Sequence, residues 1–528
     1  MIRAALLTLV LGACAGGCGA GARVHRSASG SPRSHTASGP YRWLVRTSGP
    51  QPTVAQENRR PGSTAWRLPG PAADVGGLAH GSVIGYVSQQ ALAPGQTERV
   101  YVSAPGSKLG RVRVFRMGWY GGRGGREVLV SKKLPLVTQP PCVHRFASGL
   151  TECDWHPALS FAIPASLPSG VYIAKLSTAT GASDCLFVVR ASAPQPLLAQ
   201  LPTSTYEAYN AWGGDSLYPG GADRVGVTGT SQGIEVSYDR PYDSVTGAGQ
   251  FFARDVAMVR FLERYGYPVS YTTSESVDED PGQLAGHRAL IDFGHSEYWS
   301  ARQEQAFARV RGATSLLFFG SDTLAWRVRY APASAAVGRA GEPDHTIVAY
   351  KEHAPLDPDR SDPTGAFPDG GAALTGSAYL GCITPRVPGP GPPTYRYYAW
   401  TPSPGLAPSW LFARTGITPA TRIPGIVGYE LDQRTPASPP GTEAVGGGSA
   451  PCMTPEPGEP APGPGQDIAQ TAVYTTPSGA TVFNTGTLGW ELGLEPVPGA
   501  SPDAPPAPDP RVVALTRNVL AHVLGGGR

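Results

Sequence analysis

Charge is scarce in this sequence, and none of it is concentrated. Charged residues make up 16% of the 528 positions, against about 25% in an average soluble protein. The 43 lysines and arginines and the 40 aspartates and glutamates leave a formal net charge of +3, and no basic run or aromatic–basic stripe occurs. We therefore expect no nucleic-acid partner.

Long apolar runs are also missing, except for a short one at the N-terminus. Residues 1–18 carry one arginine, the run AALLTLVLGA, and Cys14 and Cys18 among small residues. This pattern is typical of an export signal and is too short for an ordinary membrane span. "LGAC", ending at Cys14, resembles a bacterial lipobox, "AGGC", ending at Cys18, is a second option, and a plain secretory signal is the alternative. Residues 19–39 are predicted to be a flexible tether.

These features predict an exported protein, anchored by a lipid at the outer face of the bacterial cell membrane or otherwise secreted. The lipid would be its only contact with the membrane, because no later segment is apolar for long enough to cross one.

Cysteine is sparse, at seven residues. In an oxidising compartment, the economical pairing joins Cys142 to Cys153 across a short loop and Cys382 to Cys452 across a long one. Cys185 is left alone in the apolar segment DCLFVVR, where we expect a small core residue rather than a reactive thiol. These spacings do not suit a zinc site.

Glycine (68) and proline (55) are abundant, which favours strands, turns and irregular connections. A chain of this length is too long for one core, so several domains are expected. Residues 40–192 are predicted to form an all-β sandwich, with strands near Arg99–Ala104, Arg111–Gly122, Ser169–Thr178 and Cys185–Arg190. The segment PSGVYIAKL is similar to the late strand pair of an immunoglobulin-like domain.

From residue 196 to residue 528, apolar strands alternate with amphipathic helices, which predicts an α/β domain with a parallel sheet. The expected strands include Leu197–Leu201, Ala289–Phe293, Ser315–Gly320 and one near Thr481, and the expected helices include 252–267, 301–311 and 511–524. The Pro/Gly-rich stretches Arg434–Gln466 and Pro496–Pro510 are expected to be surface excursions outside the core.

Polar and aromatic residues follow three of these strands at their carboxyl ends, where parallel sheets bind ligands. They are Tyr206, Tyr209 and Trp212, then His295 and Glu297, then Ser321 and Asp322. Phenolate and carboxylate oxygens are hard donors that suit a hard trivalent ion such as Fe(III). A metal site at this edge is one hypothesis, and ordinary caps and turn formers are the plain alternative.

The stretch Gly294–Tyr298 also resembles a serine nucleophile elbow. Gly294-x-Ser296 lies between a strand and a helix, as in G-x-S-x-G. However, Tyr298 occupies the fifth position, where glycine is needed for close approach. The later histidines His345, His353 and His522 lie in no convincing motif. A serine hydrolase is therefore the weaker alternative.

Six segments, in order, resemble the large subunit of N,N-dimethylformamidase and its broad family. They are PTSTYEAYNAWGG, SYDRPY, FLERYGYPVSYTT, GHRALIDFGHSEYWS, VGYELD and VFNTGTLGW, within residues 197–525. GWYGGRGGR and SGVYIAKL resemble the β-domain that precedes this part in exported members. The resemblance implies an α/β domain similar to the glutamine-amidotransferase-like fold. It also implies a mononuclear iron held by two tyrosines and a glutamate, with a histidine two residues before the glutamate.

By this resemblance, Glu297 and His295 take the places of the glutamate and the histidine. Tyr209 in "AYN" and Tyr242 in "DRPY" are the best candidates for the tyrosines, and Tyr206 and Tyr238 are reserves. Two further catalytic candidates are Glu430 in "GYELD" and Asp322, which stands where asparagine would be expected, a departure that affects substrate orientation.

The implied activity is hydrolysis of a C–N amide bond in a small amide. Fe(III) would be held by Tyr209, Tyr242 and Glu297, with His295 or Glu430 moving a proton to the leaving amine. A non-enzymatic surface lipoprotein that binds a glycan or a protein partner is the competing hypothesis.

Overall fold

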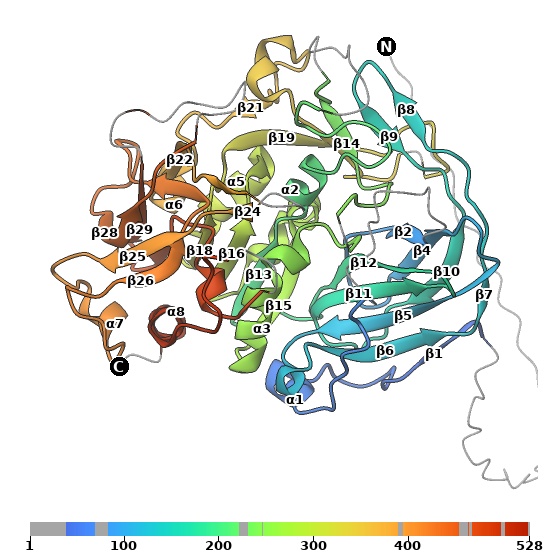
Figure 1. Ribbon diagram of the computed structural model, residues 1–528, viewed down its shortest axis with the longest axis horizontal. Coiled ribbons are helices and arrows are strands. Elements are labelled where there is room, and N and C mark those ends of the chain that lie inside the picture. The colour runs from blue at the N-terminus through green and yellow to red at the C-terminus, as the bar shows by residue number, and fades with distance from the viewer. Residues whose placement is uncertain are drawn as a thin grey trace, which may run out of the picture. The chain divides into compact units, whose positions relative to one another are not determined.

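The computed structural model describes residues 39–68, 83–220, 231–244, 246–339, 341–388, 394–453, 463, 467–497 and 502–525. The predicted export signal, the lipidation candidates Cys14 and Cys18 and nearly all of the tether lie outside the described residues. Most elements are strands in several sheets, with few helices (Figure 1). A β-sandwich followed by an α/β domain was expected; the structure has several sheets, and the immunoglobulin-like and amidotransferase-like likenesses stay predictions. Among the described residues, no helix is both long and apolar enough to cross a bilayer.

Two sheets come from the first part of the chain. Their strands span Tyr41–Trp43 (β1), Ile84–Val87 (β2), Ala91–Leu92 (β3), Thr97–Ser103 (β4), Leu109–Met117 (β5), Gly125–Ser131 (β6), Leu134–Pro135 (β7), Pro157–Ala162 (β10), Gly170–Ser177 (β11) and Ala182–Val189 (β12). The larger sheet has the order β1-β6-β5-β11-β12-β3 with β7 beside β5, and the smaller one the order β10-β4-β2. β5 begins by alternating exposed and buried residues, as a strand with one buried face must.

A nine-stranded sheet is formed by the second part. Its strands span Leu197–Leu201 (β13), Val269–Thr273 (β15), Ala289–His295 (β16), Ser315–Ser321 (β18), Tyr398–Pro402 (β25), Ile423–Val427 (β26), Glu443–Ser449 (β28), Ile468–Thr475 (β29) and Thr481–Asn484 (β30). Their order is β15-β13-β16-β18-β30-β29-β28-β25-β26. The first five strands pair in parallel and the last four in antiparallel fashion.

Smaller sheets surround the carboxyl ends of the parallel strands. They use Val143–Arg145 (β8), Leu150–Glu152 (β9), Glu235–Ser237 (β14), Tyr298–Ser300 (β17), Trp326–Ala331 (β19), Thr346–Val348 (β20), Gly365–Ala366 (β21), Ala378–Ile383 (β22), Arg386–Val387 (β23), Thr394–Tyr395 (β24) and Glu430–Gln433 (β27). β17, β19, β20 and β14 form one sheet with β21 at its side, while β22 pairs with β27, β23 with β24, and β8 with β9.

The helices are short, and the longer ones lie near their predicted positions. They span Val54–Asn58 (α1), Thr203–Ala208 (α2), Val256–Arg264 (α3), Ser274–Glu279 (α4), Ala301–Val310 (α5), Ala372–Thr375 (α6), Ser409–Phe412 (α7) and Pro510–Val523 (α8). Ser300 caps α5 by accepting a hydrogen bond from the backbone N–H of Gln303, as serine does at many helix starts. The side chain of Gln303 instead donates to Gln200, so the cap is only half of a capping box.

The expectation that residues 434–466 stay outside the core is wrong for β28. This strand pairs with β29 and β25, and its Val445 is fully buried. Glycine makes the position possible, because a Cβ added at Gly446 would lie 2.1 Å from the ring of Trp400. The missing side chain lets the indole pack directly on the strand.

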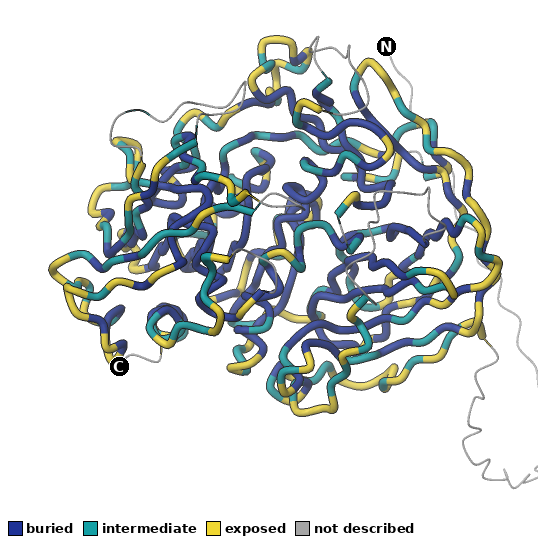
Figure 2. The backbone as a smooth tube through the Cα atoms, in the orientation of Figure 1, coloured by how far each residue is buried: buried dark blue, intermediate teal, exposed yellow. Residues whose placement is uncertain are grey.

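One continuous core joins the two parts of residues 40–528. A single apolar cluster contains Phe115 and Val188 from the first part together with Phe261 and Ile291 from the second, and Figure 2 shows the strands as largely buried. Arg116 and Glu263 cross the same boundary as a bidentate ion pair, at 2.7 and 2.8 Å, and neither side chain is exposed. The desolvated pair fixes how α3 packs on β5.

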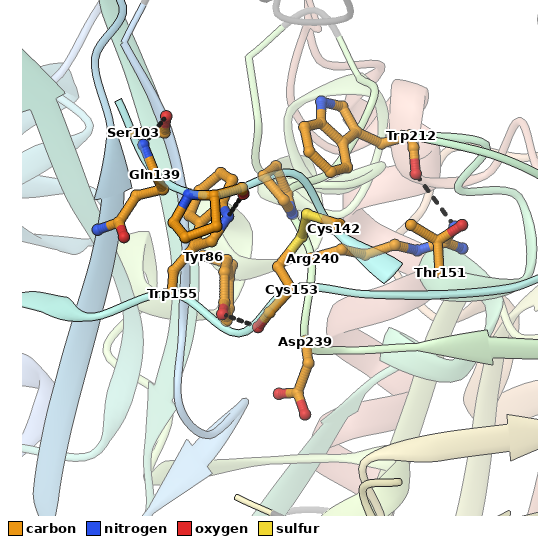
Figure 3. Close-up of a disulfide and its surroundings, with 12 residues drawn as sticks. Tyr86, Ser103, Gln139, Cys142, Thr151, Cys153, Trp155, Trp212, Asp239 and Arg240 are labelled. Carbon is orange, nitrogen blue, oxygen red and sulfur yellow. Dashed lines mark hydrogen bonds between the residues drawn. A yellow bond between two sulfur atoms is a disulfide. The ribbon is translucent and has the colours of Figure 1, made fainter. Parts of the chain in front are cut away.

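Both predicted disulfides, Cys142–Cys153 and Cys382–Cys452, are present, and Cys185 is free and buried, which confirms the predicted pairing. Figure 3 shows the first disulfide among aromatic side chains. The Tyr86 hydroxyl donates to the carbonyl of Cys153 at 2.6 Å, and the backbone N–H of Cys153 donates to the carbonyl of Asp239. The disulfide hairpin thereby supports the YDRPY segment of the second part.

Candidate metal centre

The centre is built where β16 and β18 end. His295 is the last residue of β16 and pairs with Ser321, the last residue of β18. Gly294 has a φ of 75°, and a Cβ there would lie 2.1 Å from a carboxylate oxygen of Asp255. Only glycine fits this close approach. The turn that follows carries Glu297, whose backbone N–H donates to the hydroxyl of Thr205 on α2 at 3.0 Å.

Three oxygen donors converge beside α2. The Tyr209 hydroxyl donates to Oε2 of Glu297 at 2.9 Å, and the Tyr218 hydroxyl lies 2.6 Å from Oε1 of Glu297. The two hydroxyls are 2.8 Å apart, and the two rings stack with centroids 4.4 Å apart. Glu297 is only 2% exposed, while both tyrosines are half-buried, so the group opens on the tyrosine side.

A second polar group lies directly behind Glu297. Nε2 of His295 is 3.3 Å from a carboxylate oxygen of Glu297, 3.4 Å from one of Asp322 and 3.0 Å from one of Glu430. Nδ1 of the same imidazole is 3.4 Å from the hydroxyl of Tyr429. All of these residues are buried. One imidazole nitrogen therefore faces three carboxyl groups and cannot donate its single proton well to each.

Burial decides the charges in this second group. It lowers the pKa of His295 to about 3, although the Glu297 carboxylate acts in the opposite direction. It raises the pKa of Glu430 to about 8, although the nearby cation of Arg254 opposes the rise. Both shifts have the sign expected for a charged form removed from water. Near neutral pH, Glu430 therefore holds the proton and His295 is neutral.

Two neighbouring sets of side chains could hold a metal ion. One consists of Tyr209, Tyr218 and Glu297, whose two hydroxyls lie 2.8 Å apart and each lie within 2.9 Å of one carboxylate oxygen of Glu297. The other consists of His295, Asp322 and Glu430, whose donor atoms lie within 4.8 Å of one another. An all-oxygen set with two phenols suits a hard trivalent ion, while a mixed nitrogen and oxygen set suits a divalent ion.

Buried cations stabilise the neighbourhood of the tyrosines. Arg240 donates to Glu207 at 2.8 Å and to the carbonyls of Asn210, Trp212 and Asp215. It thereby clamps the chain after α2, between the two tyrosines. The ammonium of Lys351 lies 3.5 Å from the centroid of the Tyr218 ring. A cation over the ring face stabilises negative charge on that phenol.

The other predicted tyrosines do not reach this group. Tyr242 lies in the main core cluster, and among the described residues its buried hydroxyl has no hydrogen-bond partner. Its ring centroid is 6.5 Å from that of Tyr206, whose hydroxyl donates a hydrogen bond to Asp255. Tyr238 lies in a separate apolar cluster with Tyr298 and Trp326. The structure thus brings Tyr209, Glu297, His295, Asp322 and Glu430 together and places Tyr218 where Tyr242 was expected.

Tyr218 is not among the site residues predicted from the sequence. It lies after Gly213, in a polar stretch that shows neither helical nor strand periodicity. Its one signal is its position nine residues after Tyr209, in a loop of a length that is often functional.

Ser296 does not have the surroundings of a nucleophile. Its hydroxyl donates to Asp292 at 2.9 Å and accepts from the indole N–H of Trp299, also at 2.9 Å. Within the described part of the chain, no imidazole bonds to this hydroxyl, so the base of a serine hydrolase is lacking. The residue is 1% exposed and supports the turn.

Comparison with known proteins agrees with the resemblance seen in the sequence. The family described as N,N-dimethylformamidase beta subunit-like, C-terminal, matches residues 111–504, which is more than half of the chain. No match was found among curated proteins. A solved carbohydrate acetylesterase from Xanthomonas citri is 12% identical, over 48% of this chain and 59% of that one, with a TM-score of 0.13, too low to carry an argument. By the family match, the chain belongs to the N,N-dimethylformamidase beta subunit-like family.

Proposed function

We propose that this protein is a metal-dependent hydrolase of C–N amide bonds. The observation that carries the proposal is the convergence of the Tyr209, Tyr218 and Glu297 oxygens at 2.6–2.9 Å. Three such donors around one point suit a hard cation such as Fe(III), whose charge would take the place of the two hydroxyl protons. When bound, such an ion supplies Lewis acidity toward a carbonyl oxygen or a water.

The residues behind Glu297 support the proton transfers of amide hydrolysis. Water adds to the carbonyl carbon, the C–N bond breaks, and the nitrogen leaves as an amine after gaining a proton. Glu430 holds a proton near neutral pH and is the residue that we assign to donate it. The proton that the attacking water loses then restores Glu430, while the neutral His295, 3.0 Å from Glu430, holds that carboxyl group in place. Asp322 faces the same imidazole nitrogen at 3.4 Å and orients it.

The test uses the full chain purified with iron and a panel of small amides. The proposal expects one iron per chain and release of amine that stops when the metal is removed. Asp322→Asn should retain the iron, because Asp322 is outside the three-oxygen set, while Glu297→Gln should lose it. Loss of iron in Asp322→Asn together with retention in Glu297→Gln would instead favour the set of His295, Asp322 and Glu430.

The competing function is binding without turnover, to a glycan or a protein partner at the cell surface. Stoichiometric iron with no amine released across the panel would favour it. Export and a lipid anchor at Cys14 or Cys18 remain part of the proposal. Partition of the mature protein into a detergent phase tests the anchor, and a soluble form that begins beyond Cys18 would contradict it.

A further inference from the structure

Arg254 lies beside the candidate metal centre, two residues before the start of α3. The next residue, Asp255, approaches Gly294 so closely that a Cβ there would lie 2.1 Å from its carboxylate. The guanidinium carbon of Arg254 lies 4.4 Å from the centroid of the Tyr429 ring. The hydroxyl of Tyr429 in turn lies 3.4 Å from Nδ1 of His295. One aromatic side chain thus connects this cation to the imidazole of the centre.

Arg254 has no carboxylate partner, unlike the arginines buried in the fold. Arg116 pairs with Glu263 and Arg240 with Glu207, and none of these four side chains is exposed. Arg254 is half-buried, and it forms no ion pair with any residue that the structure describes. A partly desolvated cation without a counter-charge is unfavourable. This guanidinium therefore favours a ligand that brings an anion.

The surroundings hold Arg254 in place and add a second positive charge. The Tyr429 ring stacks on that of Tyr395, with centroids 4.2 Å apart and an interplanar angle of 14°. The backbone N–H of Ala257 donates to the carbonyl of Arg254 at 2.9 Å. Arg386 on β23 is exposed and lies 5.9 Å from the centroid of Tyr395. Each ring of the stacked pair thus has an arginine beside it, and two such cations attract anions from solution.

The two nitrogens of His295 face the two parts of such a ligand site. Nε2 faces three carboxyl groups, of which Glu430 is the nearest at 3.0 Å. Nδ1 faces Tyr429, whose ring carries Arg254. A small molecule with an amide on the first side and an anion on the second would extend across the imidazole. The planar guanidinium matches a carboxylate, because two parallel N–H groups can donate to its two oxygens.

We propose that Arg254 binds the carboxylate of the substrate, so that the amide belongs to a small anionic molecule such as an N-acyl amino acid. The identity of this molecule as a substrate rests on the proposed amide hydrolysis. The contact with the carboxylate uses only Arg254 and needs no metal. Arg254 is therefore a residue that determines specificity, and binding can be measured apart from turnover.

Calorimetry on the full chain without metal tests the contact with three ligands that differ at one end. N-acetyl-β-alanine ends in a carboxylate, N-(3-hydroxypropyl)acetamide in an alcohol and N-(3-aminopropyl)acetamide in an ammonium. The carboxylate should bind saturably, the alcohol about tenfold or more weakly, and the ammonium more weakly still. No binding of the carboxylate, equal binding of the alcohol, or tighter binding of sulfate than of the carboxylate would overturn the proposal.

Variants then test whether Arg254 makes the contact. Arg254→Met removes the charge and should bind the carboxylate no better than the alcohol. Arg254→Lys keeps the charge without the planar fork and should bind between these limits. Arg42→Met removes an exposed cation on β1 and should bind as the unaltered chain does. Full binding by Arg254→Met, or equal weakening by Arg42→Met, would contradict the assignment. If Arg254→Met does not fold, Arg254→Lys and the three ligands decide the question.

Turnover by the iron-loaded chain separates this inference from the proposed function. Hydrolysis of N-acetyl-β-alanine consumes water and releases acetate and β-alanine, and its kcat/KM should exceed that of the alcohol by about tenfold or more. Carboxylate binding that depends on Arg254, with no amine released from any ligand, would support the contact and overturn the hydrolase. Equal kcat/KM for all three ligands would support the hydrolase and overturn the role of Arg254.

Discussion

The hydroxyl of Tyr218 lies 2.6 Å from Oε1 of Glu297, although 79 residues separate them in the chain. Tyr218 comes from the irregular segment after α2, and Glu297 from the turn after β16. Both ends of this contact are held, the first by the Arg240 clamp and the second by Gly294 and Thr205. Such a preformed contact brings two hard oxygen donors together, as the proposed metal site requires.

Replacement of Tyr218 by phenylalanine should remove most of the bound iron. The change deletes one donor oxygen and leaves the ring that stacks on Tyr209. The absorption band of phenolate bound to iron should fall with the metal content. Elemental analysis and a visible spectrum of the purified variant are the measurements.

Tyr242→Phe is the matched control for this experiment. The Tyr242 hydroxyl is buried and bonds to none of the residues that the structure describes. Its removal should therefore leave iron and absorption unchanged, with stability altered by about 1 kcal/mol or less. If Tyr242→Phe lost the iron and Tyr218→Phe kept it, the assignment of the tyrosines would be reversed.

Ser296→Ala should retain iron and any amide hydrolysis within about threefold, because its hydroxyl only supports the turn. The loss of its contacts with Asp292 and Trp299 should lower the free energy of unfolding by about 1–3 kcal/mol. Turnover rates and denaturant unfolding check the two statements separately. A loss of turnover by several orders of magnitude with iron intact would instead support a serine nucleophile.

The Arg116–Glu263 pair should show strong coupling in a double-mutant cycle. Arg116→Met or Glu263→Gln alone leaves one charge in a fully buried site, and each should cost about 3–5 kcal/mol. The double variant should cost clearly less than the sum, since no lone charge remains. Denaturant unfolding of all four proteins measures the coupling, and additive losses would contradict it.

Glu98 should make stability depend on pH. Burial raises its pKa from 4.5 to about 8, so between these pH values the folded chain keeps a proton that the unfolded chain releases. The free energy of unfolding should therefore fall as the pH rises through this window.

Glu98→Gln should reduce this dependence, because the amide stays neutral. It can still place a carbonyl oxygen where Glu98 accepts from the N–H groups of Ser88 and Arg99. Unfolding free energies at about pH 5 and about pH 9 are compared for the two proteins. An equal fall in the free energy of unfolding of both proteins would show that Glu98 does not cause the pH dependence.

Local patterns in the sequence were enough to predict the strands that carry the centre. The apolar runs of β13, β16 and β18 are decided by residues close in the chain. The disulfide pairs were also predicted from the sequence, because few cysteines leave few pairings. His295 and Glu297 could also be placed at a strand end, because they come just after the apolar run Ala289–Phe293.

Only the tertiary structure decided which tyrosine joins them. Tyr218 and Tyr242 both lie in irregular segments, where no periodicity says which way a side chain points. Their positions depend on distant contacts, the Arg240 clamp in one case and packing against Tyr206 in the other. The sequence did not predict β28 as a core strand for a similar reason. Its glycines show no strand pattern, and its buried position depends on the packing of the distant Trp400. Local sequence thus determined the strands and the residue types at their ends, while long-range packing determined which of those residues meet.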